Sequence, residues 1–468
     1  MPRLPNDPDQ FIQRKGSPGD LDLSFRPAIG VESHQQNSSV HAIAIQEDGR
    51  ILIGGHFETY DGVPRVAVAR LQSTGLLDSS FDPAEGLTVF DAANNQQLTG
   101  TVGDLAIRRI PSPSGDDRYE ITVVGLFTHL RHSPSRYIAR LDDAGNKVPS
   151  FSSPFEIQDG RESEPPVEEG SERTAIHFPG SVGLWQDQTI VSQSFRRCGD
   201  FERWAIARLG PTGSCDASYA HQSKGSTGSR NVGAGPSLVL PDGSVLFGGN
   251  FDYWGDTRTP DGTLQYEPRP RIARFTPSGG LDRGFGPAAY EDANGTFHTG
   301  RGPVHALARQ TDGKFLVVGN FFYIKPNSNT ELGSLVRLHS DGSWELPGPQ
   351  LPDGIASRIF AIAVEPQPGD EPDKILIAGD FQTYGDVPRN RLARLHSDGS
   401  LDTSFDPGEG PNGPVKTLAV QPDGSLLIGG SFTEYAGRRR HGVARVLLHK
   451  IERVKAPEKE ESEDLPSL

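Results

Sequence analysis

The sequence predicts an all-β protein, a seven-bladed β-propeller of four-stranded antiparallel blades. Three observations predict this fold. A strand–turn–strand pattern recurs seven times, an arginine-bearing strand follows each copy, and the fourth strand that the last copy lacks is found at the beginning of the chain. Glycine and proline account for 55 and 38 of the 468 residues, which suits short strands joined by tight turns better than helices.

Each copy opens with two short apolar strands joined by an Asp-Gly turn or its equivalent, as in VHAIAIQEDGRILIGGHF and VKTLAVQPDGSLLIGGSF. Asp-Gly supplies the positive φ that hairpin turns need. In the first of these strands Ala42 and Ala44 alternate with Ile43 and Ile45, so both sheet faces are apolar, as blades packed face to face require. The copies end at Phe57, Phe127, Phe195, Phe251, Phe321, Phe381 and Phe432.

A third strand follows each phenylalanine after a loop of variable length, and it carries an Ala/Val-Arg-Leu-like triplet. An arginine that recurs once in every copy is expected to make a structural ion pair or carbonyl contact rather than to bind an anion. Asp78 and Asp402, in the LDxSF elements that follow, are the expected partners. The seven repeats are called units 1 to 7. Each contains one of these arginines, which are, in order, Arg70, Arg140, Arg208, Arg274, Arg337, Arg394 and Arg445.

The LDxSF element is predicted to be the fourth strand. Unit 7 stops at VARVLLHK without one, whereas residues 19–25, GDLDLSF, match GSLDTSF of unit 6. We expect this N-terminal strand to pair with unit 7 and close the ring, because closure removes an exposed sheet edge. The predicted domains are an N-terminal extension over 1–18, the propeller over 19–450 and an acid-rich tail over 451–468.

The stretches VARLQSTGLLDSSFDPAEG and LARLHSDGSLDTSFDPGEG, each after a DGRILIGG-like hairpin, resemble the delta-60 repeat family of bacterial β-propellers. The resemblance covers nearly the whole chain, although SCDASYA and SWELPGP replace the fourth-strand motif in units 3 and 5. It implies the propeller fold and a frequent association with large secreted or cell-surface proteins, hence an extracellular or cell-envelope location. It implies no established activity.

Composition excludes several classes of function. A formal net charge of −15 disfavours nucleic acid as a partner, and no stretch approaches the roughly 18 apolar residues of a membrane-spanning helix. The opening MPRLPNDPDQFIQRK lacks the apolar core of a signal peptide, so the compartment stays open. No cofactor or metal is expected, and the oligomeric state is not indicated. Cys198 and Cys215 lie in one unit and can be either a disulfide or two free thiols.

The connections between second and third strands and between units vary most in length, and they are predicted to share one face. Variable loops on a rigid scaffold are where binding sites usually lie. The unit 4 loop is the candidate site because aromatic faces beside charged groups suit a sugar or a peptide. Trp254 also aligns with Tyr60, Tyr384 and Tyr435, which favours a packing role for it. The candidate residues are Tyr253, Trp254, Asp256, Arg258 and Tyr266.

The sequence therefore predicts a non-catalytic binding or scaffolding propeller that presents variable loops to a protein or glycan ligand. One alternative is a carbohydrate-active enzyme, a glycoside hydrolase or lyase, with Glu58, Asp252, Asp380 and Glu434 at the channel mouth. Hydrolysis would need two carboxyl groups at a defined separation, one of them with a raised pKa. A second alternative is a purely architectural domain.

Overall fold

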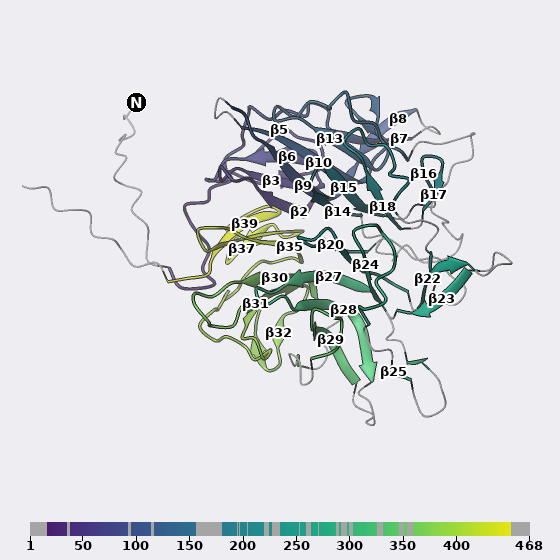
Figure 1. The fold of residues 1–468 in the computed structure, drawn as a ribbon. Coiled ribbons are helices and arrows are strands. Elements are labelled where there is room, and N and C mark those ends of the chain that lie inside the picture. Colours follow the sequence, from purple (N-terminus) through teal and green to yellow (C-terminus); the bar gives the residue numbers. More distant parts are fainter. Residues whose placement is uncertain are drawn as a thin grey trace, which may run out of the picture.

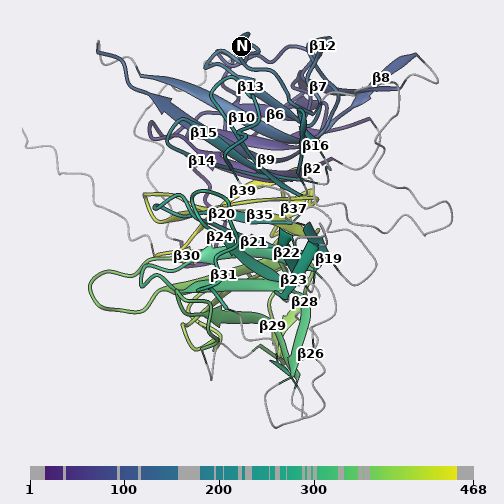
Figure 2. The same cartoon turned by 45° about the vertical axis from the view of Figure 1, so that its right-hand side comes forward.

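Every regular element that the structure, a computed structural model, describes is a β-strand (Figures 1 and 2). No described segment forms an apolar helix of membrane-spanning length. The acidic insertion 156–173 and the tail 451–468 lie outside the described residues. The structure describes residues 16–34, 38–91, 95–113, 117–155, 180–193, 195, 197–203, 205–219, 224–226, 235–251, 253–258, 264–269, 271–286, 290–291, 297–298, 303–324, 331–345, 351–352 and 359–450.

Within these residues, seven three-stranded antiparallel sheets follow the unit pattern, and in each sheet the strands lie in chain order. This architecture confirms the all-β, antiparallel part of the predicted fold class. The sheets are β2 (Ser39–Ile45), β3 (Ile51–His56) and β6 (Val68–Leu71) in unit 1; β9 (Thr101–Ile110), β10 (Arg118–Leu126) and β13 (Ile138–Leu141) in unit 2; β14 (Ser181–Trp185), β15 (Gln188–Ser192) and β18 (Ile206–Leu209) in unit 3; β20 (Ser237–Val239), β21 (Val245–Gly248) and β24 (Ile272–Phe275) in unit 4; β27 (Val304–Arg309), β28 (Phe315–Ile324) and β29 (Glu331–Leu338) in unit 5; β30 (Ile359–Glu365), β31 (Lys374–Gly379) and β34 (Leu392–Leu395) in unit 6; and β35 (Val415–Val420), β36 (Ser425–Gly430) and β39 (Val443–Leu447) in unit 7.

The predicted fourth strand is reduced to a short antiparallel contact beyond the third strand. It forms even in units 3 and 5, where the sequence motif departs from the repeat. The bridged pairs are Leu71–Leu77, Leu141–Lys147, Leu209–Cys215, Phe275–Leu281, Leu338–Trp344 and Leu395–Leu401.

The N-terminal segment makes the same contact with unit 7. Leu21 bridges Val446, and backbone hydrogen bonds join Gly19 N to Leu447 O at 2.8 Å and Asp22 N to Arg445 O at 2.8 Å. In Figure 1 the purple start of the described chain lies beside the yellow β39. Tyr435 Oη donates to Gly19 O at 2.6 Å, just as Tyr60 Oη donates to Gly75 O within unit 1.

Apolar side chains between neighbouring sheets form the core. The first strand of each unit contacts the first strands before and after it, and β35 contacts β2. One cluster joins Leu52 of unit 1 to Leu105 and Val123 of unit 2, and another joins Leu427 and Val443 of unit 7 to unit 1. Burial on both sheet faces, at about 25 cal/mol per Å² of apolar surface, is the main stabilising contribution.

Smaller sheets come from the longer connections. Several of them, with β7, β8, β16, β17, β22, β23 and β25, project to the right in Figure 1. They are β1 (Val31–Glu32) with β4 (Thr59–Tyr60) and β5 (Val63–Pro64); β7 (Leu87–Asp91) and β8 (Gln96–Thr99) with β11 (His129–Leu130) and β12 (Ser133–Pro134); β16 (Arg197–Cys198) with β17 (Phe201–Glu202); β19 (Lys224–Ser226) with β22 (Tyr253–Arg258) and β23 (Leu264–Pro268); β25 (Tyr290–Glu291) with β26 (Phe297–His298); β32 (Thr383–Tyr384) with β33 (Val387–Pro388); and β37 (Glu434–Tyr435) with β38 (Arg438–Arg439).

Candidate functional site

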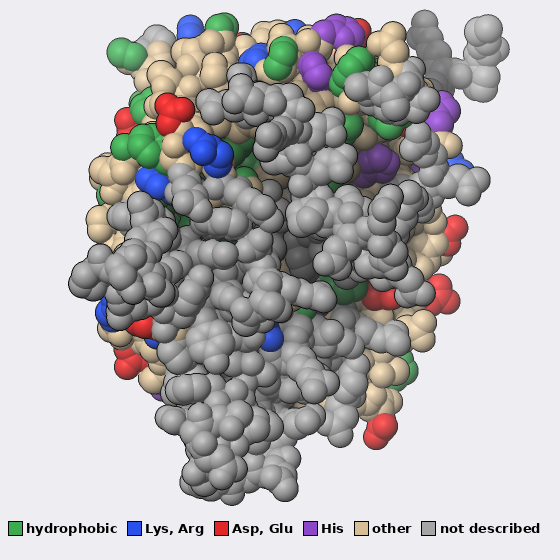
Figure 3. Space-filling model, turned by 90° about the vertical axis from the view of Figure 1, so that its right-hand side faces the viewer, with side chains coloured by type: hydrophobic (Ala, Val, Ile, Leu, Met, Phe, Trp, Pro, Cys, Tyr) green, Lys and Arg blue, Asp and Glu red, His purple; other side chains and the backbone are tan. Residues whose placement is uncertain are grey.

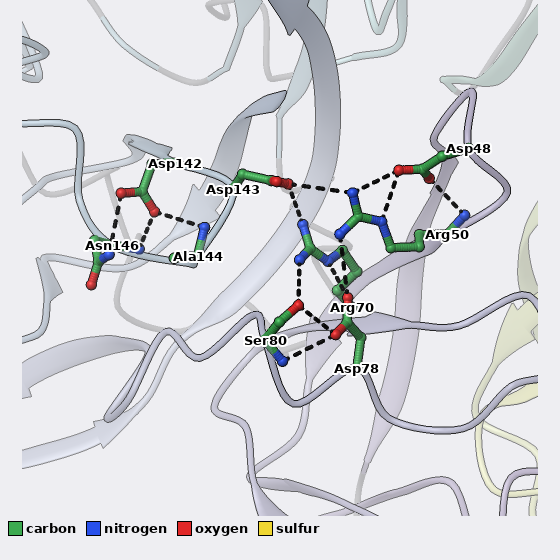
Figure 4. A network of polar contacts seen from close by, with 9 residues as sticks. All are labelled: Asp48, Arg50, Arg70, Asp78, Ser80, Asp142, Asp143, Ala144 and Asn146. Carbon is green, nitrogen blue, oxygen red and sulfur yellow. Dashed lines mark hydrogen bonds and ion pairs between the residues drawn. The ribbon is translucent and has the colours of Figure 1, made fainter. Parts of the chain in front are cut away.

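A buried polar network centred on Arg70 joins unit 1 to unit 2 (Figure 4). Arg70 Nε donates to Asp78 Oδ2 at 2.7 Å, and Arg70 Nη1 donates to Asp143 Oδ1 of unit 2 at 2.5 Å. Burial opposes ionisation of Asp78, but hydrogen bonds from Ser80 and Arg70 hold its pKa below the usual range. The pair is therefore ionised at neutral pH. This confirms the structural role predicted for the repeated arginines.

The same ion pair recurs around the molecule. Unit 2 is the exception because Val148 stands where the acid would be, and Arg140 lies 3.6 Å from Glu120 instead. The guanidinium of Arg445 pairs with Asp22, which comes from the N-terminal segment. The further pairs are Arg208–Asp216 (2.9 Å), Arg274–Asp282 (2.7 Å), Arg337–Glu345 (2.8 Å), Arg394–Asp402 (2.9 Å) and Arg445–Asp22 (2.6 Å).

Each of the seven arginines also donates to the turn of the next unit, and the acceptor is always the third residue after that unit's own arginine. The arginine of unit 7 donates to Ser73 of unit 1 at 2.7 Å. We call these seven residues the arginine belt. The contacts are Arg70–Asp143, Arg140–Pro211, Arg208–Pro277, Arg274–Ser340, Arg337–Ser397, Arg394–Leu448 and Arg445–Ser73.

The two ends of the units differ. The arginine belt and the tight turns lie where the third strands end. At the opposite end the first strands begin, and there the long connections form β7–β8, β19–β22–β23 and β25–β26. We call this end the loop face. Figure 3 views the molecule from the side to which these hairpins project, and histidine side chains gather on the upper part of that view.

The predicted unit 4 site lies on the β22–β23 hairpin, in which Gly255 pairs with Tyr266. The side chains of Tyr253, Asp256, Arg258 and Tyr266 lie outside the described residues. Trp254 is fully buried, so its indole packs in the core and is not free to stack on a ligand. Its ring contacts the rings of Phe247, Phe251 and Phe275, with centroids 5.7, 5.2 and 5.0 Å away.

The carboxylates considered for hydrolysis come from units 1, 4, 6 and 7. Burial opposes ionisation of Glu58, but hydrogen bonds from His34, Thr99 and Ser33 hold its pKa below the usual range. Asp380 lies 3.3 Å from Arg391 Nε, and Glu434 is exposed. Asp252 lies outside the described residues. Glu58 therefore has the wrong protonation for a general acid.

Cys198 and Cys215 form a disulfide, which settles the alternative that the sequence left open. Cys198 stands three residues after Phe195, the position that Tyr60 holds after Phe57. In unit 1 that tyrosine ties the hairpin to the fourth-strand segment by a hydrogen bond. In unit 3 the disulfide makes the equivalent link covalently.

The inner strands bring a second polar group together at the loop face. Lys416 of β35 donates to Ser39 Oγ at 3.2 Å and to His41 Nε2 at 3.1 Å, and both acceptors belong to β2. His56, the last residue of β3, lies 3.2 Å from Thr101 Oγ1 through its Nδ1. We call these five residues the mouth cluster. Sequence reasoning missed it, although Lys416 aligns with His41 and His305 at the second position of the VKTLAV, VHAIAI and VHALAR strands.

Burial and the neighbouring charge of Lys416 lower the pKa of His41 to about 3. His41 is therefore neutral at physiological pH, and its Nε2 can accept a hydrogen bond from the ammonium group of Lys416. Burial likewise lowers the pKa of Lys416. Among the described residues, no group of three or more His, Cys, Asp or Glu side chains is placed to hold a metal ion.

Comparison with solved structures finds β-propellers of low similarity. The extracellular domain of a B. thetaiotaomicron protein assigned as a one component system is 10% identical, with a TM-score of 0.42; the match covers 94% of this chain and 43% of that one. Virginiamycin B lyase from Staphylococcus aureus is 10% identical (TM-score 0.41; 89% and 97% covered). YCF48 bound to D1 peptide is 10% identical (TM-score 0.42; 94% and 100% covered). The chain thus spans less than half of the first of these proteins.

No curated protein matches the sequence. A family model described as a domain of unknown function (DUF5122) β-propeller matches residues 46–81, 310–344, 371–405 and 421–448. These segments belong to units 1, 5, 6 and 7, and each runs from the turn between the first and second strands to the third or fourth strand. The chain therefore contains β-propeller repeats of this family, which is of the delta-60 repeat type, in units 1, 5, 6 and 7.

Proposed function

We propose that the seven units are the blades of one closed propeller over residues 19–450, in which the N-terminal strand 19–25 completes unit 7. The cyclic order of the arginine belt supports this, because Arg445 reaches the turn of unit 1 just as Arg70 reaches that of unit 2. The bridge between Leu21 and Val446 supports it as well.

We propose further that this propeller is a non-catalytic binding module whose loop face receives a protein or glycan ligand. The observation that carries the proposal is the asymmetry between the two ends. One end repeats the same turn and the same buried arginine contacts, whereas the other carries connections that differ from unit to unit. Variation confined to one end of a rigid scaffold is typical of a recognition surface.

The enzyme and architectural alternatives are weaker. A glycoside hydrolase would need a carboxyl group with a raised pKa near a second carboxylate, whereas the pKa of Glu58 is lowered. A purely architectural role gives no reason for the irregular hairpins β7–β8 and β22–β23. The disulfide in unit 3 supports an oxidising compartment, outside the cytoplasm, as the place where the protein works.

The test is a binding screen of the whole chain against a glycan array and against immobilised cell-envelope proteins. Tyr253→Ala and Tyr266→Ala, both on the unit 4 hairpin, are expected to weaken a bound ligand at least about tenfold. Leu76→Ala is the matched control, because Leu76 is a 48% exposed apolar residue in a tight turn of the other end. Retention of no ligand, or equal loss in all three variants, would contradict the proposed function.

A further inference from the structure

Lys416 is a half-buried cation at the start of an inner strand, next to the axis of the sheets. Its ammonium group donates to a hydroxyl and to a neutral imidazole, and no described carboxylate pairs with it. A buried charge without a counter-charge is costly. In a chain of net charge −15, a pairing acid would have been easy to supply, so the missing partner calls for an explanation.

Other polar side chains of the first strands form hydrogen bonds with the backbone of the next unit. Asp104 of unit 2 accepts a hydrogen bond from Val182 N of unit 3 at 2.9 Å. His305 of unit 5 lies 2.8 Å from Ile359 O of unit 6 through its Nδ1. These groups are neutral or are satisfied by backbone. Lys416 also reaches the next unit, but its two hydrogen bonds leave a third N–H of the ammonium group for another acceptor.

The surroundings of Lys416 are suited to an anion. Ser39 of β2 supplies a hydroxyl that contacts Lys416, and Thr101 of β9 and His56 of β3 form a hydrogen-bonded pair at the same end of the neighbouring strands. These side chains lie at the loop face, where the first strands begin and the second strands end. An ammonium beside a hydroxyl can bind a carboxylate by charge-assisted hydrogen bonds, which are about twice as strong as neutral ones.

We propose that the mouth cluster is a binding site for one carboxylate group of the ligand, with Lys416 as its counter-ion. The proposal rests on the binding function proposed above and names the chemistry of its ligand. Phe360 occupies the corresponding position in unit 6, with its ring 6.0 Å from that of His305. Phe360 stands in unit 6, next to unit 7, so a ligand that carries a carboxylate beside an apolar group can use both positions, and the favoured ligand is the C-terminal residue of an extended peptide rather than an acidic sugar.

The test uses the whole chain and matched small probes measured by isothermal titration calorimetry. N-acetyl-phenylalanine carries a free carboxylate beside an aromatic ring, and N-acetyl-phenylalaninamide lacks only the charge. Glucuronate and glucose form the corresponding sugar pair. We expect the phenylalanine acid to bind at least about tenfold more tightly than its amide, as hydrogen bonds to a charged group imply. Glucuronate is expected to bind no better than glucose.

Lys416→Gln is expected to abolish the preference for the acid, and Lys416→Arg to keep it within about threefold. Lys314→Gln is the control, because it makes the same charge change at the tight turn of unit 5 and should leave binding unaltered. Thermal unfolding of each variant shows whether it folds. If Lys416→Gln does not fold, the acid preference of Lys416→Arg still tests the proposal.

Three outcomes would overturn the proposal: equal affinity for acid and amide, the same preference in Lys416→Gln as in the wild type, or no binding of any probe. Tighter binding of glucuronate than of N-acetyl-phenylalanine would overturn the assignment to peptides. A ligand retained in the array screen and unaffected by Lys416→Gln would leave the binding function standing and refute the carboxylate site alone.

Discussion

Replacing Phe25 by alanine tests whether the N-terminal segment completes unit 7. Phe25 is fully buried and lies 5.3 Å below the guanidinium of Arg445. Its ring also packs on the turn of unit 1, because a Cβ added at Gly75 would come within 2.9 Å of it. Phe285 packs on Gly342 in the same way, from unit 4 onto unit 5. Phe25 therefore takes the place of a fourth-strand phenylalanine between two neighbouring units.

Truncating a buried phenylalanine to alanine costs about 3–5 kcal/mol, and we expect Phe25→Ala to lower the free energy of unfolding by this amount. The internal reference is Phe405→Ala, since Phe405 is also fully buried and lies 5.2 Å from the guanidinium of Arg394. Urea unfolding followed by far-ultraviolet circular dichroism measures both variants. If Phe405→Ala shifts the midpoint strongly and Phe25→Ala leaves it unchanged, the segment is not part of the ring and the argument for closure fails.

Three more predictions follow from named contacts. The double variant Leu21→Cys/Val446→Cys should form a disulfide that joins the two ends of the chain, seen as faster migration on non-reducing gels, because the two residues form a bridged antiparallel pair. Reduction of Cys198–Cys215 should cost about 3 kcal/mol, measured as a lower unfolding midpoint. Asp402→Asn should cost about 1.5–3 kcal/mol at pH 7, because it removes one of the two buried carboxylates that pair with Arg394, the other being Glu365.

The Asp402 prediction has a pH dependence with a defined sign. Burial opposes ionisation, but hydrogen bonds from Lys374 and Ser404 and the charge of Arg394 hold the pKa of Asp402 well below its unfolded value of 3.8. Its contribution is therefore complete above about pH 4 and is lost as the pH falls through the folded pKa. The wild-type advantage over Asp402→Asn should shrink below pH 4. An advantage that stays constant down to pH 2 would refute the pairing.

Controls separate these effects from general damage. Leu23→Cys/Val446→Cys places one cysteine off the bridged position and should cross-link poorly. Cys198→Ser/Cys215→Ser should have the stability of the reduced protein and no response to reductant. If reductant destabilises this variant as much as the wild type, the loss does not come from the disulfide.

Much of the fold could be predicted because its determinants are local and repeated. An Asp-Gly turn between apolar runs specifies a hairpin, and an arginine eight residues before an aspartate specifies the pair seen at Arg70 and Asp78. The match of residues 19–25 to the fourth-strand motif predicted that they pair with unit 7, and Leu21 contacts Val446 there. Each short pattern alone is a weak predictor of a strand or turn, but its recurrence in every unit makes the prediction reliable because the same physical requirement is met in each.

The candidate site was harder to predict because it depends on what differs between units. Trp254 is conspicuous by its type, yet its position three residues after Phe251 assigns it to the core. Cys198 stands at the same position, and only its distance to Cys215 in space shows that a disulfide replaces the tyrosine hydrogen bond. Lys416 is inconspicuous in the sequence because it stands inside an ordinary first strand of the repeat, and its partners lie about 375 residues away in the chain.

The arginine belt and the mouth cluster, at opposite ends of the units, differ in how their positive charges are paired. At the belt every guanidinium has a carboxylate or several carbonyls, so its charge is satisfied within the protein and exerts little attraction on a ligand. At the loop face the acceptors of Lys416 among the described residues are both neutral, so its charge can pair with a ligand. Since the attraction between charges grows as water is excluded, one unpaired ammonium near the axis can contribute more to recognition than several exposed ion pairs on the rim. The end that is uniform thus holds the ring together, and the end that is irregular keeps the charge with which a ligand can pair.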